Sequence, residues 1–318
     1  MRLLRPSPDQ APFALRAMKM VVDATAPNLP ARRLMEAAQR QILGTSYDID
    51  ALAPITAAEL AQGFPDPTLR RQLVQGMIVA SIANGIPSAA QFAIVQRFAA
   101  ALAVDSPEVE TIRRLAERQM LLFRLDFYRR SHLRQMVEDQ LQYHGGLLGL
   151  VKGLLGQRGY IEDQSVAAPY RALERLPAGT LGKVFFDHCR SQGFSFPGEP
   201  GGFPEAAIYH DLTHVLSGYG VDAAGEMQIC GFQAGYMRKN TAYMALFGLL
   251  SFTTGVNMTP LPQPHSVGLL GEEDLADKFL HAVERGSRVN TDLSAHWDFW
   301  PLLALPIDEV RERLSITP

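Results

Sequence analysis

The stretch SAAQFAIVQRFAAAL, residues 88–102, carries the signals of one buried α-helix. Ser88 and Gln91 stand three residues apart, as in a capping box, where each side chain satisfies a backbone N–H at the start of a helix. Four apolar residues then recur at intervals of three and four: Phe92, Val95, Ala99 and Leu102. That spacing places them on one helical face, so the stretch predicts a helix packed into a core along that face.

Similar signals recur along the first half of the chain. Thr56 and Glu59 form a second capping-box pair. At two further places a capping residue precedes a proline, which favours the first helical position: Asp66 before Pro67, and Ser106 before Pro107. A helical stripe of apolar residues comes after the first of these: Leu69, Leu73 and Met77. Strand-like alternation is not seen, so we predict an all-α fold of short helices in succession.

Residues 108–144 are interpreted as one long polar helix. Its apolar residues are expected on the inside: Ile112, Leu115, Leu122 and Leu125. Acidic residues are interleaved with its many arginines, so a solvated face is favoured over a face that docks on anionic lipid.

Composition limits the classes of function. The 318 residues suffice for two domains of ordinary size. With 47% hydrophobic residues, 20% charged residues and a formal net charge of -3, the chain is typical neither of disorder nor of a nucleic-acid-binding protein. Cys189 and Cys230 are expected to be free thiols in a reducing compartment. The N-terminal residues lack an apolar run of signal-peptide length, so we expect a cytoplasmic protein.

The glycine-rich stretch HGGLLGLVKGLLGQRG, residues 144–159, is interpreted as the passage between two helical domains, residues 1–145 and 146–318. Within the first domain, residues from about 31 to 125 weakly resemble the TerB-like helical domain of the tellurite-resistance group, around ASIANGIPSAAQFAIVQRFAAAL, residues 80–102. That resemblance implies a helical fold alone. The acids often found in such domains are replaced here, so no metal site is expected in this half: Asn84, Gly85 and Gln91.

The strongest functional signal is YHDLTHVLSGYGVDAAGE, residues 209–226. On a helix, His210 and His214 are one turn apart, so both imidazoles can reach one ion. Asp211 could bind that ion or orient a histidine. The glycines after the second histidine favour a turn, which would bring Glu226 back toward the pair. We therefore predict a metal site on a helix–loop–helix hairpin.

Two imidazoles with carboxylates suit zinc, iron(II) or manganese. The same spacing of two histidines on a helix creates the site in H-E-x-x-H zinc proteins. The alternative is a pair of ordinary histidines near a helix start, with Asp211 as a favourable first-turn acid. H-x-x-x-H alone would favour that alternative, whereas the four groups together favour a metal site.

The pattern H-D-x-x-H, eleven residues, then E resembles the metal motif of the ubiquinone biosynthesis protein Coq-four family. Two further stretches are similar to that family: LERLPAGTLGKVFFDHCRSQGF, residues 173–194, and HWDFWPLLALPIDEVRERLSI, residues 296–316. The resemblance covers roughly residues 160–316. It implies an all-helical domain with a divalent metal, usually zinc, held by residues matching the family's ligands: His210, Asp211, His214 and Glu226.

The resemblance further implies a role in ubiquinone biosynthesis, namely metal-dependent, oxidative removal of the ring carboxylate from a polyprenylated 4-hydroxybenzoate intermediate. These four ligands would then carry the catalysis. The partners implied are the prenylated benzoate or quinone intermediate, other proteins of the pathway and the membrane surface; a homodimer is left open. Two positions depart from the family pattern: Gln233 replaces a common acid, and Cys230 replaces a usual basic residue. Both would share a helix face with Glu226, so the wall of the site is expected to differ.

The residues from 241 to 271 contain no charged side chain, and AYMALFGLLSF, residues 242–252, is almost wholly apolar. This apolar run is about half the ~20 residues that a membrane span needs, and Pro260, Pro262 and Pro264 interrupt the sequence beyond it. A buried core helix is therefore expected, which would also wall an apolar tunnel for a prenyl tail beside the metal. We expect a peripheral protein at the inner face of the cytoplasmic membrane, or on the matrix side of the mitochondrial inner membrane in a eukaryote.

Two other functions remain open from the sequence. In one, the domain binds prenyl lipids without catalysis and organises the enzymes of the ubiquinone pathway, with its metal serving structure. In the other, a metal hydrolase, the spacing of the histidines is explained, but no nucleophile is assigned. We favour the decarboxylase because sites of histidines and carboxylates often leave room for substrate, whereas closed structural zinc sites are usually rich in cysteine.

Overall fold

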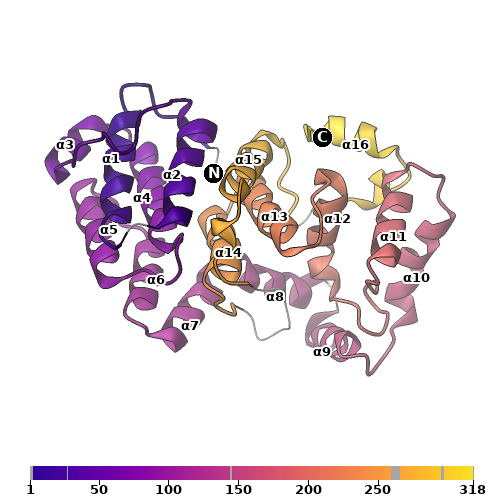
Figure 1. Cartoon of the computed structure of the whole chain (residues 1–318). Helices are drawn as coiled ribbons and strands as arrows, with labels where there is room; N and C mark the ends of the chain where they lie inside the picture. Colours follow the sequence, from indigo (N-terminus) through magenta and orange to yellow (C-terminus); the bar gives the residue numbers. More distant parts are fainter. Residues whose placement is uncertain (1–2, 27, 144, 259–265, 295–296, 318) are drawn as a thin grey trace. The chain divides into compact units, whose positions relative to one another are not determined.

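The computed structural model describes residues 3–26, 28–143, 145–258, 266–294 and 297–317. Across these ranges the chain is built from helices, and no β-strand occurs in them (Figure 1). The predicted all-α fold is confirmed.

The chain forms two compact units, each drawn from several segments. Unit 1 comprises Met1–Arg130, Asp222–Gly235 and Asn240–Ser287. Unit 2 comprises Ser131–Val221, Tyr236–Lys239 and Arg288–Pro318. The domains expected at residues 1–145 and 146–318 stay a prediction.

The helices of unit 1 begin where the capping signals predict. Its first seven α-helices, with a π-helical turn at Gln39–Leu43 after the second, are α1 (Ala11–Val22), α2 (Leu29–Ala38), α3 (Ala57–Gly63), α4 (Pro67–Ile82), α5 (Ala89–Ala101), α6 (Pro107–Ala116) and α7 (Met120–Arg130). Thr56 and Ser88 close capping boxes at α3 and α5. Asp66 accepts hydrogen bonds from two backbone N–H groups of α4. Ser106 precedes α6 as predicted, but its hydroxyl makes no capping bond.

The core of unit 1 gathers the predicted apolar stripes. The four apolar residues predicted on one face of α5 are all buried: Phe92, Val95, Ala99 and Leu102. Leu73 and Met77 of α4 are buried with them. Three later helices complete this unit: α13 (Ala223–Tyr236) up to Gly235, α14 (Thr241–Thr253) and α15 (Leu275–Arg288). Helix α4 contacts α1, α5 and α14, so the core joins segments far apart in the sequence.

The prediction of one long helix over residues 108–144 is wrong, because three helices cover this range. The helical conformation is interrupted at Arg118, whose φ of 60° is left-handed, and again between α7 and α8. Because α7 starts a new register, its buried face is formed by Phe123, Asp126 and Phe127. Leu122 and Leu125, expected inside, are 48% and 58% exposed.

The described residues of unit 2 form six α-helices: α8 (His132–Tyr143), α9 (Gly146–Gln157), α10 (Gln164–Ala172), α11 (Leu181–Ser191), α12 (Ile208–Ser217) and α16 (Ile307–Leu314). Glu199, in the segment before α12, accepts hydrogen bonds from Arg171 of α10 and Arg190 of α11. Helix α11 in turn contacts α12 and α16. These contacts fix the start of α12 against the other helices of the unit.

Two stretches singled out in the sequence form helices. The glycine-rich passage becomes α9, although His144 lies outside the described residues. The apolar stretch becomes the buried core helix α14, as expected, while residues 259–265, with all three interrupting prolines, lie outside the described residues. None of the described helices has the length and apolar character needed to cross a membrane.

Candidate metal centre

The first two candidate ligands lie on α12. This helix begins after a 3-10 turn at Glu205–Ala207 and ends at Ser217, followed by Gly218, whose φ of 79° is a conformation that glycine adopts without strain. His210 and His214 are one turn apart, and their ring centroids are 4.8 Å apart with the rings nearly perpendicular. The two Nε2 atoms are separated by 3.2 Å. The prediction that both imidazoles face the same space is therefore confirmed.

The orientation of His214 suits a ligand. Its side chain is buried, and its Nδ1 lies 3.2 Å from the backbone carbonyl oxygen of Tyr219. A carbonyl only accepts hydrogen bonds, so Nδ1 carries the proton and donates it. Nε2 is then the nitrogen without a proton, and its lone pair points toward Nε2 of His210 at 3.2 Å, an orientation usual for a metal-binding imidazole.

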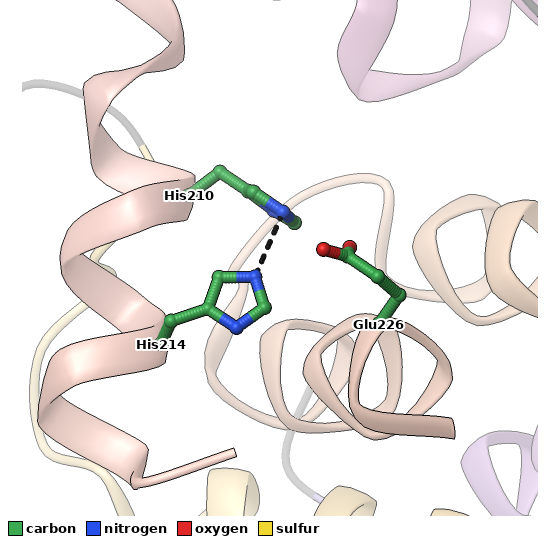
Figure 2. Close-up of side chains that lie close together, drawn as sticks. All are labelled: His210, His214 and Glu226. Atoms are coloured by element: carbon green, nitrogen blue, oxygen red, sulfur yellow. Dashed lines mark hydrogen bonds between the residues drawn. The ribbon is translucent and has the colours of Figure 1, made fainter. Parts of the chain in front are cut away.

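Glu226, near the start of α13, completes a group of three. His210, His214 and Glu226 each offer one ligand atom, and these atoms all lie within 4.8 Å of one another. Figure 2 shows the two imidazoles projecting from one helix and the carboxylate pointing toward them from the next. This group could hold a metal ion. Asp211 lies on α12 beside His210 but is not part of the group, so its role as a ligand stays a prediction.

The donor set fits a divalent transition metal. Two imidazole nitrogens and one carboxylate are the three protein ligands of several catalytic zinc sites, in which a further position stays open for water or substrate. Zinc, iron(II) and manganese all accept such donors, and the choice of zinc stays a prediction. The absence of cysteine from the group is typical of a catalytic rather than a structural zinc site.

Two further histidines of unit 2 lie beside the pair on α12, and no motif in the sequence pointed to them. His188 of α11 stacks on His214, with ring centroids 6.2 Å apart. Burial, and then the nearby His214, lower the pKa of His188. Burial, and then the charge of His210, lower the pKa of His132 at the start of α8 to about 3. Both rings are therefore neutral near pH 7.

No spacing in the sequence could have revealed these two histidines, because three different helices bring the four rings together. His188 falls inside LERLPAGTLGKVFFDHCRSQGF, residues 173–194, where no spacing singles out the histidine. The Nε2 atom of His188 is buried and has no hydrogen-bond partner among the described residues. A buried nitrogen of this kind next to His214 adds to the polar character of the site.

Two buried cysteines lie near the acidic residues Asp211 and Glu226. Burial, and then the charge of Asp211, raise the pKa of Cys189 to about 12. Burial, and then the charge of Glu226, raise the pKa of Cys230 as well. Gln233 is also buried on α13. Both cysteines are free, as predicted, and their thiols stay protonated near pH 7, so neither is a ready nucleophile.

Comparison with known proteins leaves the family of this chain unassigned: no protein-family model and no curated protein sequence matches it.

Proposed function

We propose that this chain is a metal-dependent decarboxylase of ubiquinone biosynthesis that removes the ring carboxylate of a polyprenylated 4-hydroxybenzoate intermediate. One observation carries the proposal, namely the close group formed by His210, His214 and Glu226. The motif that supplies this group is also the one that resembles the Coq-four family. The proposed metal is zinc, with iron or manganese as alternatives.

Each residue of the site has a distinct task in this proposal. A bound divalent ion would act as a Lewis acid toward the substrate's carboxylate. His210, His214 and Glu226 would hold that ion, and Asp211 would join them or orient His210. The carbonyl of Tyr219 fixes the tautomer of His214. His188 and His132 stay neutral near pH 7, so they bring no positive charge that would compete with a metal for the site.

We further propose that α9 attaches the protein to the membrane surface where the prenylated intermediate resides, together with other enzymes of the pathway. Its apolar side chains are exposed to an unusual degree: Leu147 at 70%, Leu148 at 67% and Val151 at 44%. An apolar helix face of this kind is typical of helices that lie in a membrane interface. Lys152 of α9 forms an ion pair with Asp163 at 3.1 Å, so the proposed attachment is mainly apolar.

The test combines metal content with turnover. Purified protein should hold about one divalent ion per chain, and His210→Ala and Glu226→Ala should each lose it. The matched control is His281→Ala, which removes an exposed histidine from α15 and should retain the metal. The loaded protein is then incubated with oxygen and prenylated 4-hydroxybenzoate labelled at the carboxylate, and release of labelled carbon dioxide is measured.

The outcomes separate the proposed functions. Release of carbon dioxide that stops in His210→Ala but continues in His281→Ala supports the decarboxylase. Binding of the labelled lipid without release would favour the non-catalytic lipid-binding and scaffolding role, which the exposed face of α9 would serve equally well. Protein that takes up none of zinc, iron or manganese would contradict the metal site itself.

A further inference from the structure

A cavity lies inside unit 1, built from residues of that unit alone. Its volume is about 200 Å³, and its wall includes residues of α1, α2, α4, α6, α13, α14 and α15 together with Leu3 and Pro6 of the N-terminal segment. The lining is almost entirely apolar, with Met18, Leu73 and Leu246 among its residues. An engineered apolar cavity of about 150 Å³ stays dry and binds benzene, so this one has room for a larger apolar group.

One acid interrupts the apolar lining. Glu108 of α6 is 4% exposed and lines the cavity. Its Oε1 accepts hydrogen bonds from Gln75 at 3.1 Å and Arg71 at 3.4 Å. Its Oε2 is buried and has no hydrogen-bond partner among the described residues. A buried carboxylate oxygen without a donor is costly, and native structures rarely leave one unexplained.

The neighbouring polar side chain is already engaged and does not offer Glu108 a second donor. Gln72 also lines the cavity, but its amide nitrogen donates to the backbone oxygen of Leu4 at 2.7 Å. Its amide oxygen accepts from the backbone N–H of Leu4 at 2.9 Å. This pair of bonds instead holds the N-terminal segment against α4, where it closes part of the cavity wall.

We propose that this cavity binds an apolar chain that ends in a hydrogen-bond donor, a hydroxyl or an ammonium group, which donates to Oε2 of Glu108. The apolar wall would take the chain, and each further methylene that it buries strengthens binding by about fourfold. The carboxylate selects the head group, because an anionic head would meet a negative charge of its own sign among apolar side chains. This proposal does not depend on the metal site or on the proposed decarboxylase.

The preference for the head group can be measured by displacement. The neutral dye N-phenyl-1-naphthylamine, which brightens in apolar surroundings, is bound to the full chain at pH 7.5. It is then displaced by three ligands with the same chain: 1-octanol, octylamine and octanoate. We expect octanol or octylamine to displace the dye at a concentration at least about tenfold lower than octanoate, because a hydrogen bond to a charged group discriminates by roughly that factor. The alcohol and the amine separate a neutral donor from a cationic one.

Two variants locate the binding. Glu108→Gln keeps the size of the side chain but removes its charge, so the preference over octanoate should shrink to about threefold or less. The control Glu110→Gln removes a carboxylate two residues away on the same helix that faces Arg113 instead of the cavity, and it should leave the preference unchanged. Gly76→Leu fills the cavity, because a Cβ at Gly76 would meet only the Met18 sulfur, at 4.0 Å. Leucine also favours the helix over glycine, so this variant should fold and fail to bind the dye.

The proposal is overturned by any of three results. Octanoate could displace the dye from the unmutated chain as well as octanol and octylamine do. Glu108→Gln could keep the preference for octanol or octylamine over octanoate, which would mean that another group contacts the ligand's head group. Gly76→Leu, shown to be folded by its helical circular dichroism, could bind the dye with unchanged affinity, which would place the dye elsewhere on the protein.

Discussion

Glu199 is a buried acid of unit 2 that accepts hydrogen bonds from two arginines and a backbone N–H, and its replacement tests how α12 is held in place. Its side chain is 8% exposed. Oε1 accepts from Arg171 at 2.6 Å and from Arg190 at 2.7 Å. Oε2 accepts from Arg190 at 2.8 Å and from the backbone N–H of Phe196 at 2.9 Å. The carboxylate thus ties α10 and α11 to the segment that leads into α12.

The cost of Glu199→Gln can be worked from the pKa of this carboxyl. Burial alone would raise the pKa, but Arg190, Arg171 and the N–H of Phe196 outweigh it and lower the pKa from 4.5 to about 2. At 1.36 kcal/mol per pKa unit, the charged form stabilises the fold by about 3 kcal/mol. Breaking a buried ion pair by removing one partner has a similar cost, about 3 to 5 kcal/mol. We therefore expect Glu199→Gln to lower the free energy of unfolding by about 3 kcal/mol at pH 7.

The loss should depend on pH in a definite direction. The pKa of Glu199 is lower in the folded state, so its contribution is complete above the unfolded pKa of about 4.5 and disappears as the pH falls through 2. At pH 3 the Glu199 carboxyl contributes less than half of the stabilisation that it contributes at pH 7. The difference in stability between the unmutated chain and Glu199→Gln should therefore shrink to roughly 1 kcal/mol at pH 3.

Urea denaturation monitored by tryptophan fluorescence measures the stability of unit 2, which contains Glu199. The chain has two tryptophans, Trp297 and Trp300, and both belong to unit 2. Trp300 packs against Tyr170 of α10, with ring centroids 5.1 Å apart, so its fluorescence reports on the helix that Glu199 holds. Glu174→Gln, which changes an exposed acid, is the control and should cost less than about 0.5 kcal/mol. A Glu199→Gln loss below about 1 kcal/mol at pH 7, or one that is equal at pH 3 and pH 7, would refute this reasoning.

Three further predictions concern other parts of the chain. Asp126→Asn should destabilise unit 1 by about 3 kcal/mol, because Asp126 is fully buried and ion-paired with Arg129 and Arg130; faster hydrogen exchange in α6 and α7 would show it, and unchanged exchange would contradict it. Gly286→Ala should lower the thermal midpoint, since its Cβ would lie 2.0 Å from the carbonyl oxygen of Phe232; Gly76→Ala, with open space around it, is the control. Replacing Leu147 and Leu148 together by Glu should reduce co-sedimentation with lipid vesicles severalfold, whereas Leu29→Glu, at an exposed position in α2, should not; equal losses would argue against attachment through α9.

The starts of the early helices could be predicted because a capping side chain acts within three residues of its own position. Thr56, Asp66 and Ser88 all form the expected bonds with the backbone N–H groups of the next few residues. The pairing of His210 with His214 is local in the same sense, since one helical turn alone sets their separation. Ser106 shows the limit of this reasoning, because its position before Pro107 was predicted correctly while its hydroxyl makes no capping bond.

The sequence by itself determined the features that depend on one helix at a time: the all-α class, the buried stripe of α5 and the histidine pair on α12. Only the tertiary structure showed that the chain turns at Arg118 and exposes Leu122, because apolar spacing continues through a turn even when the helix does not. It also placed His188 beside His214 and left Glu108 facing an apolar cavity. These arrangements join helices that are distant along the chain, and no short-range pattern encodes which side chains meet when such helices pack.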